Sequence, residues 1–124
     1  MTRKAKFAEH ADCLKWLESN RENNDFDPAV LDYPTCELYV APDDEPKGCL
    51  PVHGVMMLES LGFNTDDPKE RLVAALEMVQ TAVERCKQSG IKEMVFLSSD
   101  ARTDEFCTRV LGFREVKAFR KVLP

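Results

Sequence analysis

The feature that most constrains this chain is a helix signal followed directly by a strand signal in its second half. Residues 67–70 (DPKE) provide a capping residue, a proline at the first helical position and an acid three residues after the cap. Gly90 then supplies a left-handed stop. Between them an apolar stripe at helical spacing contains Leu72, Ala75, Leu76, Val79, Ala82, Val83 and Cys86. We therefore predict a helix over residues 67–89.

The segment after this helix has the pattern of a buried strand. Residues 91–97 (IKEMVFL) form a short apolar run, which is typical of a strand covered on both faces of a parallel or mixed sheet. We expect residues 91–98 to be an interior strand beside a strand that ends near Phe63. A short helix after Asp100, closed by Gly112, and a final basic strand should complete this half.

In the first half of the chain, the sequence predicts a strand and a helix, followed by antiparallel strands. Residues 3–20 combine a short strand with a helix, and the polar residues 21–27 form a loop. We predict a strand at residues 36–41, from its composition, and a turn at residues 42–48. Residues 49–61 return as extended structure that Pro51 and His53 should make irregular or bulged. A third strand fits only if this run breaks near His53.

Composition indicates one soluble domain over residues 1–124. The net charge of -5 argues against nucleic-acid or membrane-surface binding, because either needs a cationic face. Four of the last eleven residues are basic, which leaves open a local patch or a solvated strand face.

The cysteines and histidines predict no metal site. The five cysteines contain no C-x-x-C pair, and two histidines are too few to complete a zinc spacing. With no secretory signal or long apolar run, reduced thiols in a cytoplasmic protein are the simplest account. Most of the cysteines should be small buried hydrophobes.

A family resemblance comes from residues 100–113 (DARTDEFCTRVLGF). In the sequence, a predicted helix and strand come before this string, and a basic segment follows it. This order resembles the C-terminal half of the GNAT N-acetyltransferase superfamily. The resemblance covers the last half of the chain well and the first half loosely. The string LGF also occurs in glyoxalase-like folds, where several strands follow it. Only eleven residues follow Phe113, so GNAT is the closer match.

The resemblance implies an α/β (α+β) fold, a GNAT-like mixed sheet with helices on both faces, of acyl-CoA N-acyltransferase type. The sheet would split between a strand at residues 59–63 and the strand at 91–98, and acetyl-CoA would bind there. The residues that the resemblance places at the cofactor are Leu61, Phe63, Lys69, Arg71, Leu72, Val73, Ala74 and Asp100.

The cofactor loop departs from the family signature of glutamine or arginine, two residues, glycine, one residue, then glycine or alanine. Arg71 is kept, but Ala74 and Leu76 replace the two small positions. Such glycines let the backbone and the helix amides approach a pyrophosphate. Acids at the helix start (Asp66, Asp67 and Glu70) would repel phosphate, and Lys69 and Arg71 offset this in part. We expect weak or absent acetyl-CoA binding; the alternative is simply a well-capped helix.

Two residues are candidates for catalysis by the same resemblance. Cys107 occupies the position of the tyrosine that protonates the leaving thiolate, and a thiol with a pKa near 8.5 can serve as an acid. The alternative is a core cysteine. Glu59 is the strand-placed candidate for the general base, or else an outward surface residue. His53, beside Gly54, is the other base candidate, or else a turn residue. Asp100 stands where the family has asparagine and can equally cap the short helix.

Two functions therefore remain open. One is an acyl-CoA-dependent N-acetyltransferase with a degenerate cofactor loop, acting on a small amine or a protein acceptor. The other is a non-catalytic GNAT-like protein that serves in binding or assembly. Whether the chain is an enzyme is not decided by these motifs.

Overall fold

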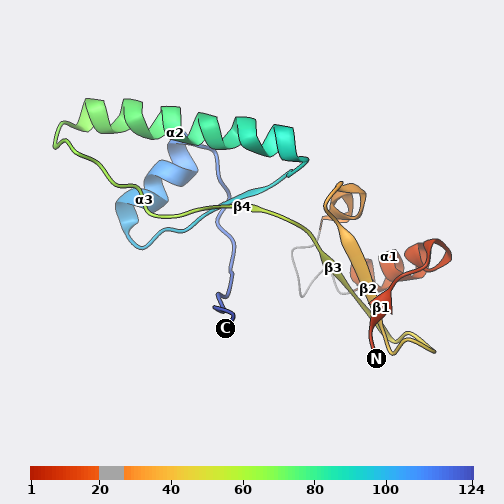
Figure 1. Ribbon diagram of the computed structural model, residues 1–124. Coiled ribbons are helices and arrows are strands. Elements are labelled where there is room, and N and C mark those ends of the chain that lie inside the picture. Colours follow the sequence, from red (N-terminus) through yellow and green to blue (C-terminus); the bar gives the residue numbers. More distant parts are fainter. Residues whose placement is uncertain (20–26) are drawn as a thin grey trace.

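The computed structural model describes residues 1–19 and 27–124 and has a mixed α/β architecture (Figure 1). One part holds a three-stranded antiparallel sheet with α1, and the other holds a two-stranded parallel sheet with α2 and α3. In chain order the elements are β1 (Arg3–Lys4), η1 (Phe7–Glu9), α1 (His10–Ser19), η3 (Pro28–Asp32), β2 (Glu37–Ala41), β3 (Gly48–Val52), β4 (Met56–Leu58), α2 (Pro68–Ser89), β5 (Met94–Phe96), α3 (Ala101–Glu105) and η4 (Phe106–Val110). None of these helices is long and apolar enough to cross a membrane.

The antiparallel sheet has the order β1-β2-β3 and one covered face. Side chains alternate along β2, so Leu38 and Val40 point to one face, where both are buried. Cys13 of α1 packs against them and has no exposed surface. The predicted first strand, first helix and strand at residues 36–41 are confirmed.

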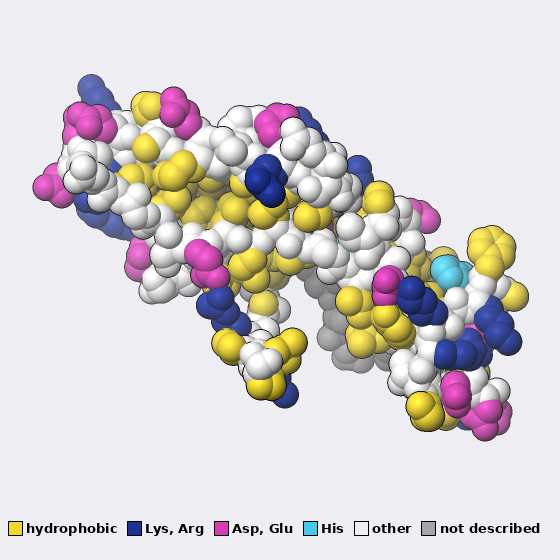
Figure 2. Space-filling model, in the orientation of Figure 1, with side chains coloured by type: hydrophobic (Ala, Val, Ile, Leu, Met, Phe, Trp, Pro, Cys, Tyr) yellow, Lys and Arg dark blue, Asp and Glu magenta, His cyan; other side chains and the backbone are white. Residues whose placement is uncertain are grey.

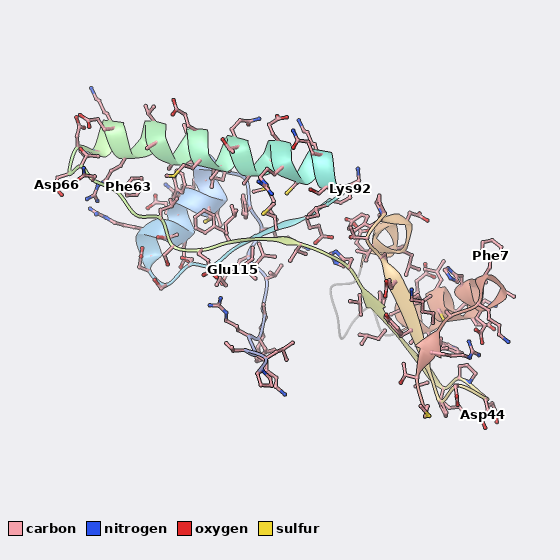
Figure 3. The ribbon with its side chains drawn as sticks, in the orientation of Figure 1. Phe7, Asp44, Phe63, Asp66, Lys92 and Glu115 are labelled. Carbon is pink, nitrogen blue, oxygen red and sulfur yellow. The ribbon has the colours of Figure 1, made fainter. Side chains whose placement is uncertain are left out.

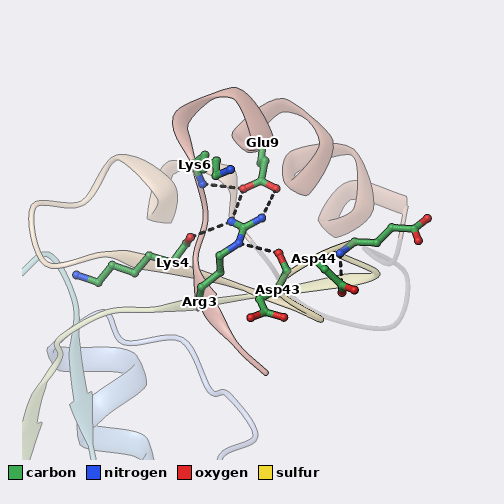
Figure 4. Close-up of polar contacts among 7 residues, drawn as sticks. Arg3, Lys4, Lys6, Glu9, Asp43 and Asp44 are labelled. Carbon is green, nitrogen blue, oxygen red and sulfur yellow. Dashed lines mark hydrogen bonds and ion pairs between the residues drawn. The ribbon is translucent and has the colours of Figure 1, made fainter.

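Arg3 connects three segments of this part (Figure 4). Its guanidinium donates to both carboxylate oxygens of Glu9, at 2.7 and 2.9 Å, and its Nε donates to the Asp43 carbonyl at 2.9 Å. Glu9 also accepts from the Lys6 amide at 2.8 Å. Hydrogen bonding to Arg3 and then to the Lys6 amide lowers the pKa of Glu9 to about 2. The network fixes β1 against η1 and against the β2–β3 turn.

The turn after β2 and the break after β3 lie where they were predicted, but the expected bulge at Pro51 is not present. Pro51 lies in regular register opposite Leu38, so β3 is not bulged at this residue. A strand on the sheet edge tolerates proline because its amide need not donate. The chain instead leaves the sheet at residues 53–55, before β4 begins. The short helix η3 was not predicted, and residues 21–26 of the predicted loop lie outside the described residues.

Helix α2 is the longest element and confirms its prediction. The Asp67 side chain accepts from the Lys69 amide, and Gly90 ends the helix with φ 70°. Ala75, Val79 and Cys86 are its buried residues. Leu72 and Leu76 of the predicted stripe are 43% and 42% exposed, and Leu72 lines the cleft described below.

Strands β4 and β5 pair in parallel, with Met57 opposite Val95. The prediction of an interior strand at residues 91–98 is wrong, since β5 is half-buried and pairs with β4 in a two-stranded sheet. The strand expected at residues 59–63 is also shifted, because β4 ends at Leu58. The Leu97 amide donates to the Leu58 carbonyl at 3.0 Å as the last bond of this ladder, and the two strands then separate.

The C-terminal region contains the predicted short helix, but it lacks the predicted final strand. The Asp100 side chain caps α3, and Gly112 has φ 72° after η4. Residues 112–124 form no strand, so that prediction is wrong. An extended segment becomes a strand only when a neighbouring edge satisfies its amides, and this segment does not join the β4–β5 sheet.

Candidate functional site

The candidate site is a cleft where β4 and β5 separate, between the start of α2 and the start of α3. It has a volume of about 700 Å³. In open α/β sheets, ligands bind beyond the carboxyl ends of parallel strands, which is where this cleft lies. Figure 3 shows Phe63 and Asp66 together at the start of α2, on this side of the molecule. The lining residues are Ser60, Leu61, Phe63, Asp66, Pro68, Arg71, Leu72, Ala75, Leu97, Ser99, Asp100, Arg102, Thr103 and Phe106.

Arg71 is the cation of the first turns of α2 that lines the cleft, and two of its nitrogens already donate to the protein. Its Nε donates to the Thr65 carbonyl at 2.6 Å, and its Nη2 donates to Asp66 Oδ1 at 3.2 Å. The guanidinium also lies over the Phe63 ring, 5.5 Å from the centroid. Arg71 therefore has an acid beside it, which offsets part of its attraction for a phosphate.

Carboxylates occupy the starts of both helices at the cleft. Asp67 Oδ1 accepts from the Lys69 amide at 2.9 Å, and Asp100 Oδ1 accepts from the Thr103 amide at 2.8 Å. The hydrogen bond from the Thr103 amide is the main cause that lowers the pKa of Asp100. Each carboxylate thus takes an amide and the positive end of a helix dipole, which are the groups that hold phosphates at helix N-termini.

Half of the predicted site residues line the cleft and half do not. Leu61, Phe63, Arg71, Leu72 and Asp100 are in the lining, whereas Lys69, Val73, Ala74, Glu59 and Cys107 lie outside it. Val73 is 55% exposed on another face of α2, because residues two positions from Arg71 point away from its face of the helix. What any of these residues would contribute to cofactor binding or catalysis stays a prediction.

Cys107 is buried in η4, with 6% of its surface exposed. Burial is the main cause that raises the pKa of this thiol, and the negative charge of Asp104 also raises it. Phe106 precedes it and points to the cleft lining, while Cys107 is turned away by one helical position. Val110, at the end of the same short helix, is 52% exposed.

Glu59 and His53, the two candidates for the general base, both contact residues outside the cleft lining. Glu59 Oε1 accepts from Arg120 Nη2 at 2.6 Å, with both side chains more than half exposed. His53 packs edge-on against Tyr33, with ring centroids 5.4 Å apart, and its Nε2 is 4.0 Å from Glu93. His53 therefore belongs to the junction between β3 and β4 and not to the cleft lining.

The site residues that sequence reasoning missed include Arg102 of α3 and Phe106 at the start of η4. Arg102 and Phe106 both line the cleft and are four residues apart, which is one face of a helix. That spacing was readable in the sequence, but only the pairing of β4 with β5 brings α3 to the start of α2. Within residues 1–19 and 27–124, no group of three or more histidine, cysteine or acidic side chains is placed to hold a metal.

Comparisons with known proteins give little further information. No protein-family model matches the sequence, and no curated protein matches it. Among solved structures, this chain is similar to a protein described as a probable acetyltransferase, with 16% identity and a TM-score of 0.43. That alignment covers 100% of this chain and 97% of the other. A likeness at this level supports no inference about activity.

Proposed function

We propose that this chain is a divergent GNAT-like domain that acts in binding or assembly and does not transfer acetyl groups by the usual route. The proposal begins from the sequence resemblance over residues 100–113 and from a cleft beyond two parallel strands. In active GNAT enzymes, such a cleft takes the pantetheine arm of acetyl-CoA. In this chain, carboxylates already occupy the amides at both helix starts beside the cleft, which supports weak or absent binding of the phosphates of acetyl-CoA.

The observation that carries the proposal is the position of Cys107. It stands where the resemblance requires an acid for the leaving thiolate, and it is buried outside the cleft lining. A general acid must lie within hydrogen-bond reach of the atom that it protonates. Among the described lining residues the ionisable side chains are Asp66, Arg71, Asp100 and Arg102. Asp66 and Asp100 already accept hydrogen bonds from the protein.

The test is an acetyl-transfer assay with mass-spectrometric detection, using acetyl-CoA with small amines and lysine peptides. We expect no acetylation above the non-enzymatic rate from the native chain. Cys107→Tyr restores the family residue, and we expect no activity from it because the site faces the core. Acetylation by either protein that disappears in Arg71→Ala would overturn the proposal.

A second candidate is a working acyl-CoA-dependent N-acyltransferase that uses another acid. The presence of Arg71 and Arg102 in one cleft favours it, because two guanidinium groups can bind phosphates. If this candidate holds, Arg71→Ala should weaken acetyl-CoA binding by roughly 1.5–3 kcal/mol, as for a lost charge-assisted hydrogen bond. Arg85→Ala is a matched control, since Arg85 is exposed on α2 and lies outside the cleft lining.

A further inference from the structure

The molecule exposes far more surface than a compact chain of its size. Its accessible surface is 9731 Å². A compact monomer of 14.1 kDa exposes about 6,700 Å² by the usual scaling with mass. The difference, about 3,000 Å² by the same scaling, exceeds the ~800 Å² that each partner contributes to a standard interface. Figure 2 shows apolar side chains gathered in several places on this open surface.

One of these places is a groove on the face of the antiparallel sheet opposite α1. The groove has a volume of about 620 Å³, and its lining includes Tyr39, Leu50 and Val52. Tyr39 and Leu50 are opposite each other in the β2–β3 register and point away from α1, because Leu38 and Val40 take the α1 side. Leu50 and Val52 are 63% and 45% exposed. Exposed apolar faces of this kind are candidates for contacts with other chains.

The rim of the groove is acidic. Ala41 and Gly48 line one end of it, and the turn between them carries the exposed residues Asp43, Asp44 and Glu45. Figure 3 shows Asp44 at the outer end of this turn. Asp43 pairs with the N-terminal amine at 3.7 Å and Glu45 with Lys47 at 2.9 Å. The three acids outnumber Lys47 and the N-terminal amine by one charge, so this end of the groove is negative and a suitable occupant combines apolar and basic residues.

Residues 114–124 have that composition and have no sheet to join in their own chain. Their apolar residues are strongly exposed, and Phe119 and Val122 are 89% and 83% exposed. Four basic residues and one acid give the segment a charge of +3, in a chain whose net charge is -5. The rest of the chain therefore carries -8. Arg120 bonds to Glu59 beside β4, which keeps the segment in the part of the molecule that does not contain the groove.

We propose that residues 114–124 of one chain bind the groove of a second copy, and that the two copies exchange these segments symmetrically. Phe119 and Val122 would enter the groove beside Leu50, and the basic residues would face the acidic turn. An exchange fills both grooves in one closed two-fold dimer. The inference does not depend on the β4–β5 cleft, so it can fail while the proposed function stands.

The first experiment measures the mass of the full chain by sedimentation velocity over a range of concentrations. We expect a dimer of about 28 kDa, twice the 14.1 kDa of one chain. Leu50→Asp in the groove and Phe119→Asp in the segment should each raise the dimer dissociation constant at least about tenfold, as for buried apolar anchors. Phe7→Asp is the control, because Phe7 is 92% exposed and belongs to neither surface. A monomer at all concentrations would overturn the proposal.

The second experiment tests which surfaces meet. Equal amounts of ¹⁴N- and ¹⁵N-labelled chains are mixed, unfolded and refolded together, then treated with a carbodiimide that joins lysines to carboxylates. We expect cross-links from Lys117 or Lys121 to the turn at residues 43–45, with half of the linked pairs carrying mixed labels, as random pairing of two chains requires. Links that carry only matched labels would show an intramolecular contact and contradict the exchange. Circular dichroism of each variant verifies that the monomer remains folded.

Discussion

Cys107 shows how one residue decides between a catalytic and a structural interpretation. The sequence resemblance predicts it at the acid position of a GNAT enzyme, yet its side chain is buried and 6% exposed. We predict that in native protein Cys107 reacts with a maleimide only on unfolding, because its thiol is both buried and held protonated. Peptide mapping by mass spectrometry gives the site of labelling. Fast native labelling that coenzyme A suppresses would contradict this.

Burial of Cys107 also predicts a cost for a larger side chain. Cys107→Tyr should lower the free energy of unfolding by about 1–3 kcal/mol through overpacking. Urea denaturation followed by circular dichroism measures this change. Val110→Tyr, on the exposed side of the same short helix, should have little effect and serves as the control. Equal stability of the two variants would mean that Cys107 is not packed as described.

Glu9 gives a prediction about pH. Its pKa is lowered from 4.5 to about 2 in the folded chain. The stabilisation from its pairing with Arg3 is thus fully present above pH 4.5 and is lost as the pH falls toward 2. The difference in denaturation midpoint between the native chain and Glu9→Gln should shrink over that interval. A Glu9 carboxyl that titrates near 4.5 in the NMR spectrum of the folded protein would contradict the network.

At the scale of elements, Gly90 provides the clearest test of a helix end. Its φ of 70° suits glycine, and an added Cβ would lie 3.3 Å from Pro34 Cβ. Gly90→Ala should therefore lower the free energy of unfolding by about 1–2 kcal/mol, the usual cost of a left-handed conformation for a residue with a side chain. Gly62→Ala is the control, since its φ is not positive and its added Cβ meets nothing within 4 Å. Both can be compared by urea denaturation.

Elements defined by short-range signals were predictable, and their pairing was not. The caps at Asp67 and Asp100 and the glycine at position 90 act within a few residues, so the sequence alone located α2 and α3. The interior strand at residues 91–98 and the final strand depended on which edges meet. Such contacts join residues far apart in the chain, and an apolar run does not specify its neighbour.

The same limit applies to the candidate site. Arg71 and Asp100 were found because each belongs to a local motif at a helix start. Lys69 and Ala74 were placed at the cofactor by family register, and neither lines the cleft. Arg102 and Phe106 were missed because α3 reaches the cleft only after β4 and β5 pair.

At the scale of the whole molecule, two parts with small cores are joined by residues 53–55 and by contacts between distant segments. The T-shaped contact of Tyr33 with His53, and Gly90 beside Pro34, lie where the two parts meet. The large exposed surface follows from this open arrangement. A protein with such a surface is suited to assembly with another chain, which agrees with a role that does not require catalysis.

Calorimetric titration of the native chain with acetyl-CoA tests most directly whether the β4–β5 cleft binds this cofactor. We predict weak or absent binding, because carboxylates occupy both helix starts and Asp66 pairs with Arg71. Coenzyme A, which lacks the acetyl group, should also bind weakly or not at all. Binding of acetyl-CoA with a dissociation constant in the micromolar range or tighter, weakened in Arg71→Ala, would contradict the account.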